Sequence, residues 1–180
     1  MPCVTKTFSE EAAFWKELQV YKALENSPVP CAKVLDRQSR TLALSCLPGE
    51  NLVDWLQRQE QTGAVNWDIW EKLVDWLVAF EKQTGLVMTD VNLRNFLYDA
   101  EEKVLYGLDF EQCDKGPMIV CAAALAAFIC SYRPEQTPLK QQIAQFVLER
   151  FSDLCRLDMS QLQQETQNQA QIISRRRKSK

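Results

Sequence analysis

The sequence contains no histidine, no cysteine pair spaced as Cys-x-x-Cys and only five glycines in 180 residues. Without histidine the chain can form neither a Ser-His-Asp nor a Cys-His triad, and its seven cysteines lack the partner for a mixed Cys/His zinc site. The cysteines are odd in number and scattered, and the N-terminus lacks the pattern of a signal peptide. We therefore expect reduced thiols and a cytoplasmic protein.

Long apolar runs and a large net charge are also missing. The longest apolar run, Met118 to Cys130, is shorter than the about 20 residues that a membrane-spanning helix needs, so we expect a buried helix and no membrane partner. The net charge of −3 gives no general argument for binding nucleic acid. At the basic end, Arg175 to Lys180, a solvated tail is expected, and binding of RNA or another anionic partner is the alternative.

One stretch, residues 86–113, carries polar side chains at a spacing that suggests chemistry. Asp90 is followed five positions later by Asn95, and two short apolar runs then flank the polar turn Asp99 to Lys103. This pattern predicts a loop that leads into a β-hairpin. Asp109 ends the second strand of that hairpin, so we expect it to lie at the same mouth as Asp90 and Asn95.

This stretch resembles the active site of the protein-kinase-like superfamily, whose catalytic loop carries Asp-x-x-x-x-Asn and whose next strand ends in Asp-Phe-Gly or a variant. The resemblance implies ATP and Mg²⁺ as cofactors, Asp90 as the base, and Asn95 and Asp109 as metal ligands. Taken singly, each residue has a structural explanation, because Asp and Asn commonly cap turns and end strands. The three together, at this spacing, favour the kinase explanation.

The N-terminus extends the resemblance. Residues 2–8 are predicted to form a strand, and Ser9 is predicted to cap a helix that runs to about Glu25. In kinases a strand lysine clamps the nucleotide phosphates and is held by a glutamate from the following helix. Lys6 and Glu17 correspond to this pair, which implies that they contribute to nucleotide binding. A solvated surface charge is the alternative for each.

A second strand pair is predicted over residues 32–35 and 41–45, which completes a three-stranded small lobe. The following segment, Leu44 to Gly49, resembles the hinge of small-molecule kinases, and this implies that the backbone around Ser45 and Leu47 binds adenine. A strand followed by a simple Pro-Gly turn is the alternative.

Three features depart from the protein-kinase pattern. No Gly-x-Gly-x-x-Gly loop is present, and only five residues precede Lys6. Met88 occupies the position where the family usually has histidine. The sequence Asp109-Phe110-Glu111 is followed after about six residues by the next helix, which leaves no room for a long activation segment. Asp-Phe-Glu occurs in choline-kinase-like and aminoglycoside-phosphotransferase-like members, so the resemblance favours a small-molecule branch.

The remaining chain is predicted to be mainly helical. Helices are predicted over residues 50–61, 66–84, 118–132 and 139–157, and within 66–84 and 139–157 the apolar residues recur mostly at intervals of three and four. In the second helix this stripe comprises Trp67, Trp70, Leu73, Val74, Leu77 and Phe80, which we interpret as core; a base-stacking surface is the alternative. The fold class is therefore α+β, a minimal kinase-like fold with a truncated small lobe at 1–47, a helical large lobe at 48–157 and a polar, basic tail at 158–180.

The resemblance implies a phosphotransferase that uses ATP and Mg²⁺ to phosphorylate a hydroxyl of a small molecule. One alternative is a compact atypical protein kinase or ATPase whose open phosphate side is covered by a protein partner. Another is a pseudokinase, an interaction module without transfer activity, which the missing Gly-rich loop and Met88 favour.

Overall fold

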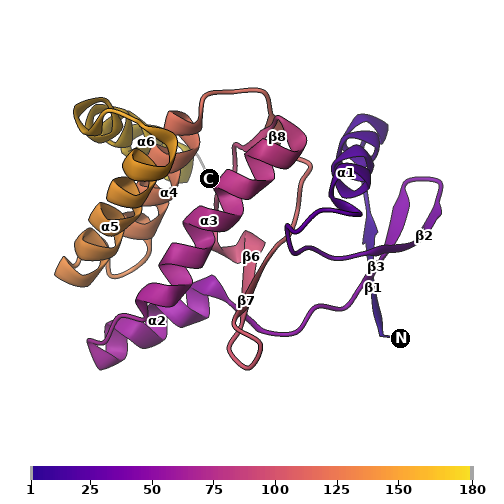
Figure 1. Ribbon diagram of the computed structural model, residues 1–180, viewed down its shortest axis with the longest axis horizontal. Coiled ribbons are helices and arrows are strands. Elements are labelled where there is room, and N and C mark those ends of the chain that lie inside the picture. Colours follow the sequence, from indigo (N-terminus) through magenta and orange to yellow (C-terminus); the bar gives the residue numbers. More distant parts are fainter. Residues whose placement is uncertain (1, 179–180) are drawn as a thin grey trace.

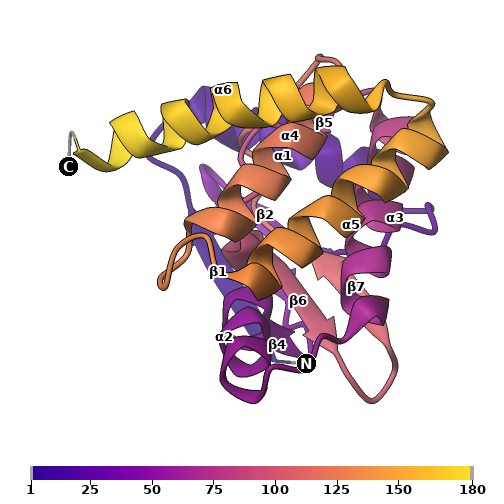
Figure 2. The same cartoon turned by 90° about the vertical axis from the view of Figure 1, so that its left-hand side faces the viewer.

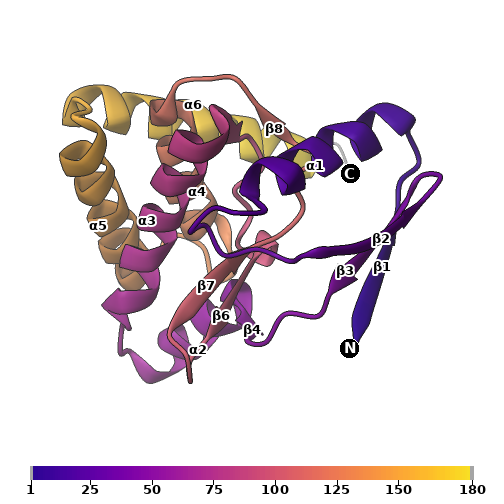
Figure 3. The ribbon, with the colours of Figure 1, turned by 45° about the vertical axis from the view of Figure 1, so that its right-hand side comes forward.

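The N-terminal part of the chain forms a three-stranded antiparallel sheet with one helix beside it. The computed structural model describes residues 2–178. Strands β1 (Cys3–Thr7), β2 (Val34–Gln38) and β3 (Thr41–Ser45) pair in the order β1-β3-β2, with Lys6 opposite Leu42 in the register. Helix α1 (Glu11–Leu24) lies against this sheet (Figure 3). The three-stranded small lobe with one helix is thus confirmed.

A β-hairpin lies between this sheet and the main helices. It consists of β6 (Phe96–Asp99) and β7 (Val104–Gly107), and the two-residue strand β4 (Glu50–Asn51) pairs with β6. A second short pair, β5 (Val87–Met88) with β8 (Cys113–Asp114), flanks the hairpin on either side in the sequence. Figure 1 shows β6 and β7 between α3 and the N-terminal sheet. The hairpin predicted from residues 95–108 is confirmed.

Five helices build the rest of the molecule. They are α2 (Leu52–Thr62), α3 (Trp67–Thr84), α4 (Met118–Ser131), α5 (Pro138–Cys155) and α6 (Met159–Lys178). The α+β fold class is therefore confirmed. The polar segment after residue 158 forms α6, which crosses α4 and buries Leu162 and Ile173 (Figure 2). Within residues 2–178 no helix combines the length and apolar character that crossing a membrane requires.

The aromatic stripe of α3 forms the core with one exception. Trp70 and Phe80 are fully buried, as predicted. Trp67 was expected in the same core, but it is 42% exposed and contacts Phe146 of α5, with ring centroids 5.0 Å apart. Trp67 is the first residue of α3, and this end of the helix is less covered by neighbouring elements than its middle.

Helix boundaries follow local sequence signals with one correction. Gly85 ends α3 at φ 69°, a left-handed conformation that favours glycine, and its N–H donates to Glu81 O at 2.7 Å, as predicted for a C-cap. The prediction that Ser9 caps α1 was wrong. The N-cap is Glu10, and no side chain caps the helix, because the chain turns one residue later than the sequence suggested.

Candidate active site

Lys6 joins three parts of the chain that are distant in sequence. Its Nζ donates hydrogen bonds to Glu17 Oε2 at 2.6 Å and to Asp109 Oδ1 at 2.7 Å. Lys6 lies on β1, Glu17 on α1, and Asp109 just after β7. The structure therefore brings together three of the residues that the sequence singled out, although 103 positions separate Lys6 from Asp109.

Glu111 completes a carboxylate cluster around Lys6, and sequence reasoning missed it. Its Oε2 lies 3.8 Å from Lys6 Nζ. One carboxylate oxygen from each of Glu17, Asp109 and Glu111 lies within 4.8 Å of the others. Three carboxylates face one ammonium group, so the cluster has a surplus of negative charge. The available signal was position, since Glu111 follows Asp109 by two residues and lies on the same strand exit.

Burial and ion pairing shift the pKa values of Lys6 and Glu17 in opposite directions. Burial alone would lower the pKa of Lys6, but its hydrogen bonds to Asp109 and Glu17 outweigh that effect and raise the pKa. Burial raises the pKa of Glu17, and the ammonium group of Lys6 opposes this shift only in part. Glu17 is fully buried, and its Oε1 has no hydrogen-bond partner among the described residues. Burial of the Lys6–Glu17 ion pair therefore carries a desolvation cost, and the charged form of Glu17 depends on Lys6 as its counter-charge.

The ring of Phe110 anchors the chain between Asp109 and Glu111 to the core. It is fully buried and contacts Tyr21 at 5.1 Å, Phe80 at 5.6 Å and Trp76 at 6.2 Å between ring centroids. Because Tyr21 lies one helical turn after Glu17 on α1, this contact fixes α1 relative to the hairpin. Asp109 itself has φ 60°, an unusual conformation for a residue other than glycine, and such outliers cluster at functional sites.

The predicted catalytic loop is closed by two hydrogen bonds. Asn95 Nδ2 donates to the backbone oxygen of Asp90 at 3.0 Å, and Leu108 N donates to the backbone oxygen of Asn95 at 2.8 Å. The first bond leaves the side-chain oxygen of Asn95 for another partner. The second holds the loop next to Asp109. Asp90, Asn95 and Asp109 therefore lie at the same end of the hairpin.

Tyr132, at the end of α4, holds the predicted catalytic loop through two hydrogen bonds of its hydroxyl. Its hydroxyl donates to Asn92 Oδ1 at 2.6 Å and accepts a hydrogen bond from Leu93 N at 3.1 Å. On the other side of Asp90, Thr89 donates from its N and Oγ1 to Gln112 O at 3.0 and 2.8 Å. Sequence reasoning missed Tyr132, because no local pattern connects it to a loop 40 residues earlier.

The predicted hinge residues lie where β3 leaves the small sheet. Ser45 N donates to Lys33 O at 2.9 Å, and Ser45 Oγ accepts from Lys33 N at 2.9 Å. The N–H of Ser45 is therefore engaged within the lobe, and adenine would have to use other backbone groups of the segment. Leu47 is partly buried and packs against the hydrophobic core.

The donor set suits magnesium. Mg²⁺ prefers oxygen ligands such as carboxylates and amide carbonyls, and Asp109, Glu111 and Asn95 supply them at one end of the hairpin. The surplus of negative charge around Lys6 gives the electrostatic reason to hold a divalent cation.

Comparisons with known proteins address the fold. No protein-family profile matches the sequence, and no curated protein matches it. Two solved structures of WbdD, one of them a co-crystal structure with the kinase inhibitor LY294002, match with TM-scores of 0.52 and 0.50 at 18% and 19% sequence identity. The chain has a kinase-like fold. Each match covers 87% of this chain, which spans only 42% and 41% of the two WbdD chains.

Within this kinase-like fold, the small lobe places Lys6 on an edge strand. β1 is the outer strand of the order β1-β3-β2, so one side of it carries no strand among the described residues. Lys6 Nζ also lies 4.8 Å from the centroid of the Phe8 ring, which favours the charged form of the lysine.

Proposed function

We propose that this protein is a phosphotransferase that uses ATP and Mg²⁺ to phosphorylate a hydroxyl group of a small molecule. The observation that carries the proposal is the double contact of Lys6 with Glu17 and Asp109, which joins the small lobe to the catalytic hairpin. A lysine held in this way is positioned to pair with nucleotide phosphates, and a neighbouring carboxylate with oxygen ligands beside it is positioned to hold metal.

Each residue has a distinct task in this mechanism. Asp90 orients the acceptor hydroxyl and accepts its proton as the oxygen attacks the γ-phosphorus. The bond from that phosphorus to the bridging oxygen breaks, and ADP leaves. Lys6 neutralises charge on the phosphate oxygens, and Glu17 keeps Lys6 in place.

Magnesium, held by Asn95 and Asp109, would supply charge stabilisation on the phosphates as they part. Adenine would bind against the segment that includes Ser45 and Leu47. The acceptor would enter from the side of Asp90 that faces away from Lys6.

Nucleotide binding is the first test. With MgATP at about 100 times its dissociation constant, the native state gains about 2.7 kcal/mol, which corresponds to a rise in melting temperature of about 5–10 °C. Asp109→Asn should lose most of this rise, whereas Asp153→Asn, an exposed aspartate on α5, should keep it. A wild-type protein whose melting temperature does not respond to MgATP would refute the proposal.

Transfer is the second test. Asp90→Asn should lower the rate of phosphorylation by about 10²–10⁴ while leaving the MgATP thermal shift unchanged, because a base acts on the acceptor and not on the nucleotide. A panel of hydroxyl compounds, incubated with MgATP and followed by mass spectrometry, identifies the acceptor. Equal product from wild type and Asp90→Asn would remove Asp90 from the mechanism.

A partner-dependent kinase or ATPase is the second candidate. The observation in its favour is the outer side of β1, which pairs with no other strand of residues 2–178 and where Val4 is 52% exposed. In that case ATP consumption by the isolated chain would be slow and would rise when a partner protein is added. Binding of MgATP without consumption under either condition would instead identify a pseudokinase.

A further inference from the structure

A cavity lies beside the catalytic loop. Its volume is about 950 Å³, and it lies between the loop, the C-terminal end of α4 and the last turns of α6. Asn92 and Arg94 line it from the loop, Tyr132 and Arg133 from the end of α4, and Arg177 from α6. Its volume falls within the range typical of small-molecule sites, about 300–1,000 Å³.

The walls of this cavity are strongly basic. Arg94, Arg133, Arg176 and Arg177 line it, and Glu135 is its single acidic lining residue. The chain as a whole carries a net charge of −3, so this concentration of arginine runs against the overall composition. Arginine presents planar donors that match phosphate and carboxylate groups, which makes this cavity suited to an anion.

The basic end of α6 is fixed at the cavity by specific contacts. Arg177 Nη2 donates to Ser131 Oγ at 2.9 Å, and its Nη1 donates to the backbone oxygen of the same serine. Nη1 of Arg177 also lies 3.5 Å from Glu135 Oε1. These contacts hold the last turns of α6 over the end of α4. Two residues of the basic segment that was expected to be a solvated tail, Arg176 and Arg177, thus line a cavity, and residues 179–180 of that segment lie outside the described residues.

The cavity communicates electrostatically with the proposed base. Burial raises the pKa of Tyr132 to about 12, and its hydrogen bond from Leu93 N opposes this rise. Arg94 and Arg177 also oppose the rise, whereas the carboxylate of Asp90 adds to it. Tyr132 and Asn92, which line the cavity, are hydrogen-bonded to each other, and Asn92 is two residues from Asp90. A molecule bound among these arginines would therefore lie beside the loop that carries Asp90.

We propose that this cavity binds the phosphate or carboxylate group of a small hydroxylated acceptor and so directs its hydroxyl to Asp90. This substrate class rests on the proposed phosphotransferase function. A small anion fits better than a nucleic acid, because the cavity is walled by apolar as well as basic groups, among them Phe128 and Ile173. Nucleic acids are bound instead on extended basic surfaces with many phosphate contacts.

The test uses inorganic phosphate as the probe and needs no activity. The wild-type chain is titrated with phosphate at constant ionic strength while backbone amide signals are followed by NMR. Signals of Asn92, Arg94 and Tyr132 should shift in a saturable manner. The dissociation constant should rise about tenfold in Arg133→Gln and at least as much in Arg94→Gln, since each loses a charge-assisted contact.

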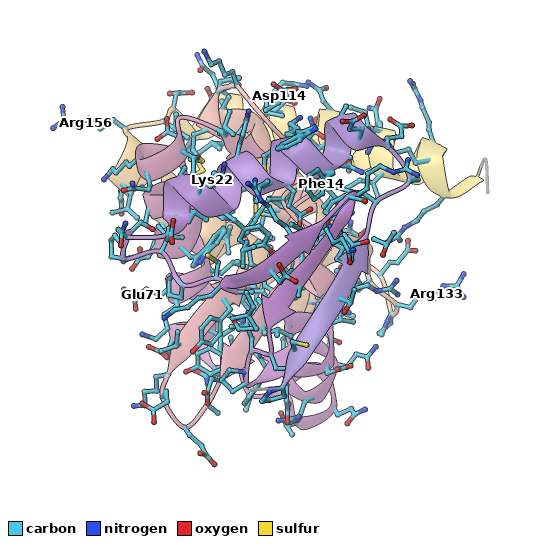
Figure 4. All side chains as sticks on the ribbon, turned by 90° about the vertical axis from the view of Figure 1, so that its right-hand side faces the viewer. Phe14, Lys22, Glu71, Asp114, Arg133 and Arg156 are labelled. Carbon is cyan, nitrogen blue, oxygen red and sulfur yellow. The ribbon has the colours of Figure 1, made fainter. Side chains whose placement is uncertain are left out.

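Arg156→Gln is the matched control, because Figure 4 shows Arg156 and Arg133 at opposite edges of the molecule. This variant should bind phosphate like wild type. Absence of saturable shifts in wild type, or equal affinity in all variants, would overturn the proposal. Tight binding of a short single-stranded RNA without binding of phosphate would overturn it in favour of nucleic acid.

The MgATP thermal shift, measured on the same samples, separates this proposal from the function on which it rests. Arg133→Gln and Arg94→Gln should keep the full shift, which also shows that they are folded. If wild type binds phosphate at the cavity but shows no response to MgATP, the phosphotransferase function fails while the anion site stands. If MgATP binds and phosphate does not, the anion site alone fails.

Discussion

At the scale of single residues, the site is organised by the competition of three carboxylates for one lysine. Lys6 contacts Glu17 and Asp109 at hydrogen-bond distance and Glu111 at 3.8 Å. Glu17 is fully buried, whereas the Asp109 side chain is 44% exposed. The buried partner therefore depends on Lys6 for its charge, and in the proposed mechanism the exposed Asp109 would bind the metal ion.

Replacing Lys6 by methionine should destabilise the protein by about 3 kcal/mol at neutral pH, because it leaves a buried carboxylate without its counter-charge. The pKa of Glu17 is already raised by burial, and loss of Lys6 would raise it further. In the variant the native state then binds more protons than the unfolded state, so its stability falls as pH rises. The deficit should therefore be large at pH 7.5 and small near pH 4.5.

Urea unfolding of wild type and Lys6→Met at these two pH values measures the deficit. Lys16→Met is the control, since Lys16 pairs only at 3.8 Å with Asp114, whose side chain is 74% exposed, and its loss should cost little at either pH. A deficit in Lys6→Met that stays constant with pH would contradict the assignment of the buried charge to Glu17.

At the scale of elements, the catalytic loop is held from two sides. The hairpin holds it through the bond between Leu108 N and Asn95 O, and α4 holds it through the hydroxyl of Tyr132. Tyr132 contacts the loop next to Asp90 and not the carboxylate cluster, so it is a positioning residue for the base in the proposed mechanism. Its removal should therefore affect turnover and not nucleotide binding.

Tyr132→Phe removes both hydrogen bonds of the hydroxyl while keeping the ring. We expect kcat to fall about tenfold, since a small misplacement of a reacting group is costly, with an unchanged KM for ATP. Tyr106→Phe on β7 is the matched control and should leave kcat unchanged. Steady-state kinetics at saturating acceptor provide the measurement. An increase of the KM for ATP in Tyr132→Phe would place the tyrosine in the nucleotide site instead.

The elements that could be predicted from the sequence are those with strong local signals. The hairpin follows from two apolar runs around a polar turn, and Gly85 marks the end of α3. The cavity could not be predicted, because α6 has a polar sequence in which, over residues 159–177, only Leu162 and Ile173 become buried. Two such residues, eleven positions apart, form no clear apolar face. Their burial depends on the alanine-rich surface of α4, which sequence periodicity does not describe.

Some residues of the candidate site could be predicted from the sequence, and others could not. Lys6, Glu17 and Asp109 were chosen because each matches a position in a known motif, and the structure brings them into contact. Glu111 belongs to the Asp-Phe-Glu variant of the motif but has no role assigned from it, and Tyr132 matches no motif, so the place of both residues in the site is seen only in the tertiary structure. A family resemblance predicts the residues that this chain shares with other members. Residues that join the site only through the packing of this chain are identified from its tertiary structure.

At the scale of the whole molecule, the reactivity of the cysteines measures how the small sheet and the helical part unfold. Cys3 on β1 and Cys46, which directly follows β3, are exposed, whereas Cys113 on β8 and Cys121 on α4 are buried. Burial raises the pKa of both buried thiols to about 12. Thiolates are the reactive form, so burial and the raised pKa both protect these two residues from thiol reagents.

With a chromogenic disulfide reagent at pH 8, Cys3 and Cys46 should react rapidly in the native protein, and a variant with both replaced by serine should lose two equivalents of fast reaction. Cys113 and Cys121 should react only as fast as the molecule unfolds, and their labelling should increase with urea in parallel with the loss of helical circular dichroism.

Early labelling of Cys31, which lies beside the hairpin through its bridge to Gly107, would show that the small sheet detaches first. Because Lys6 and Glu17 lie on the elements that would detach, addition of MgATP should then slow the labelling of Cys31 and leave that of Cys3 unchanged.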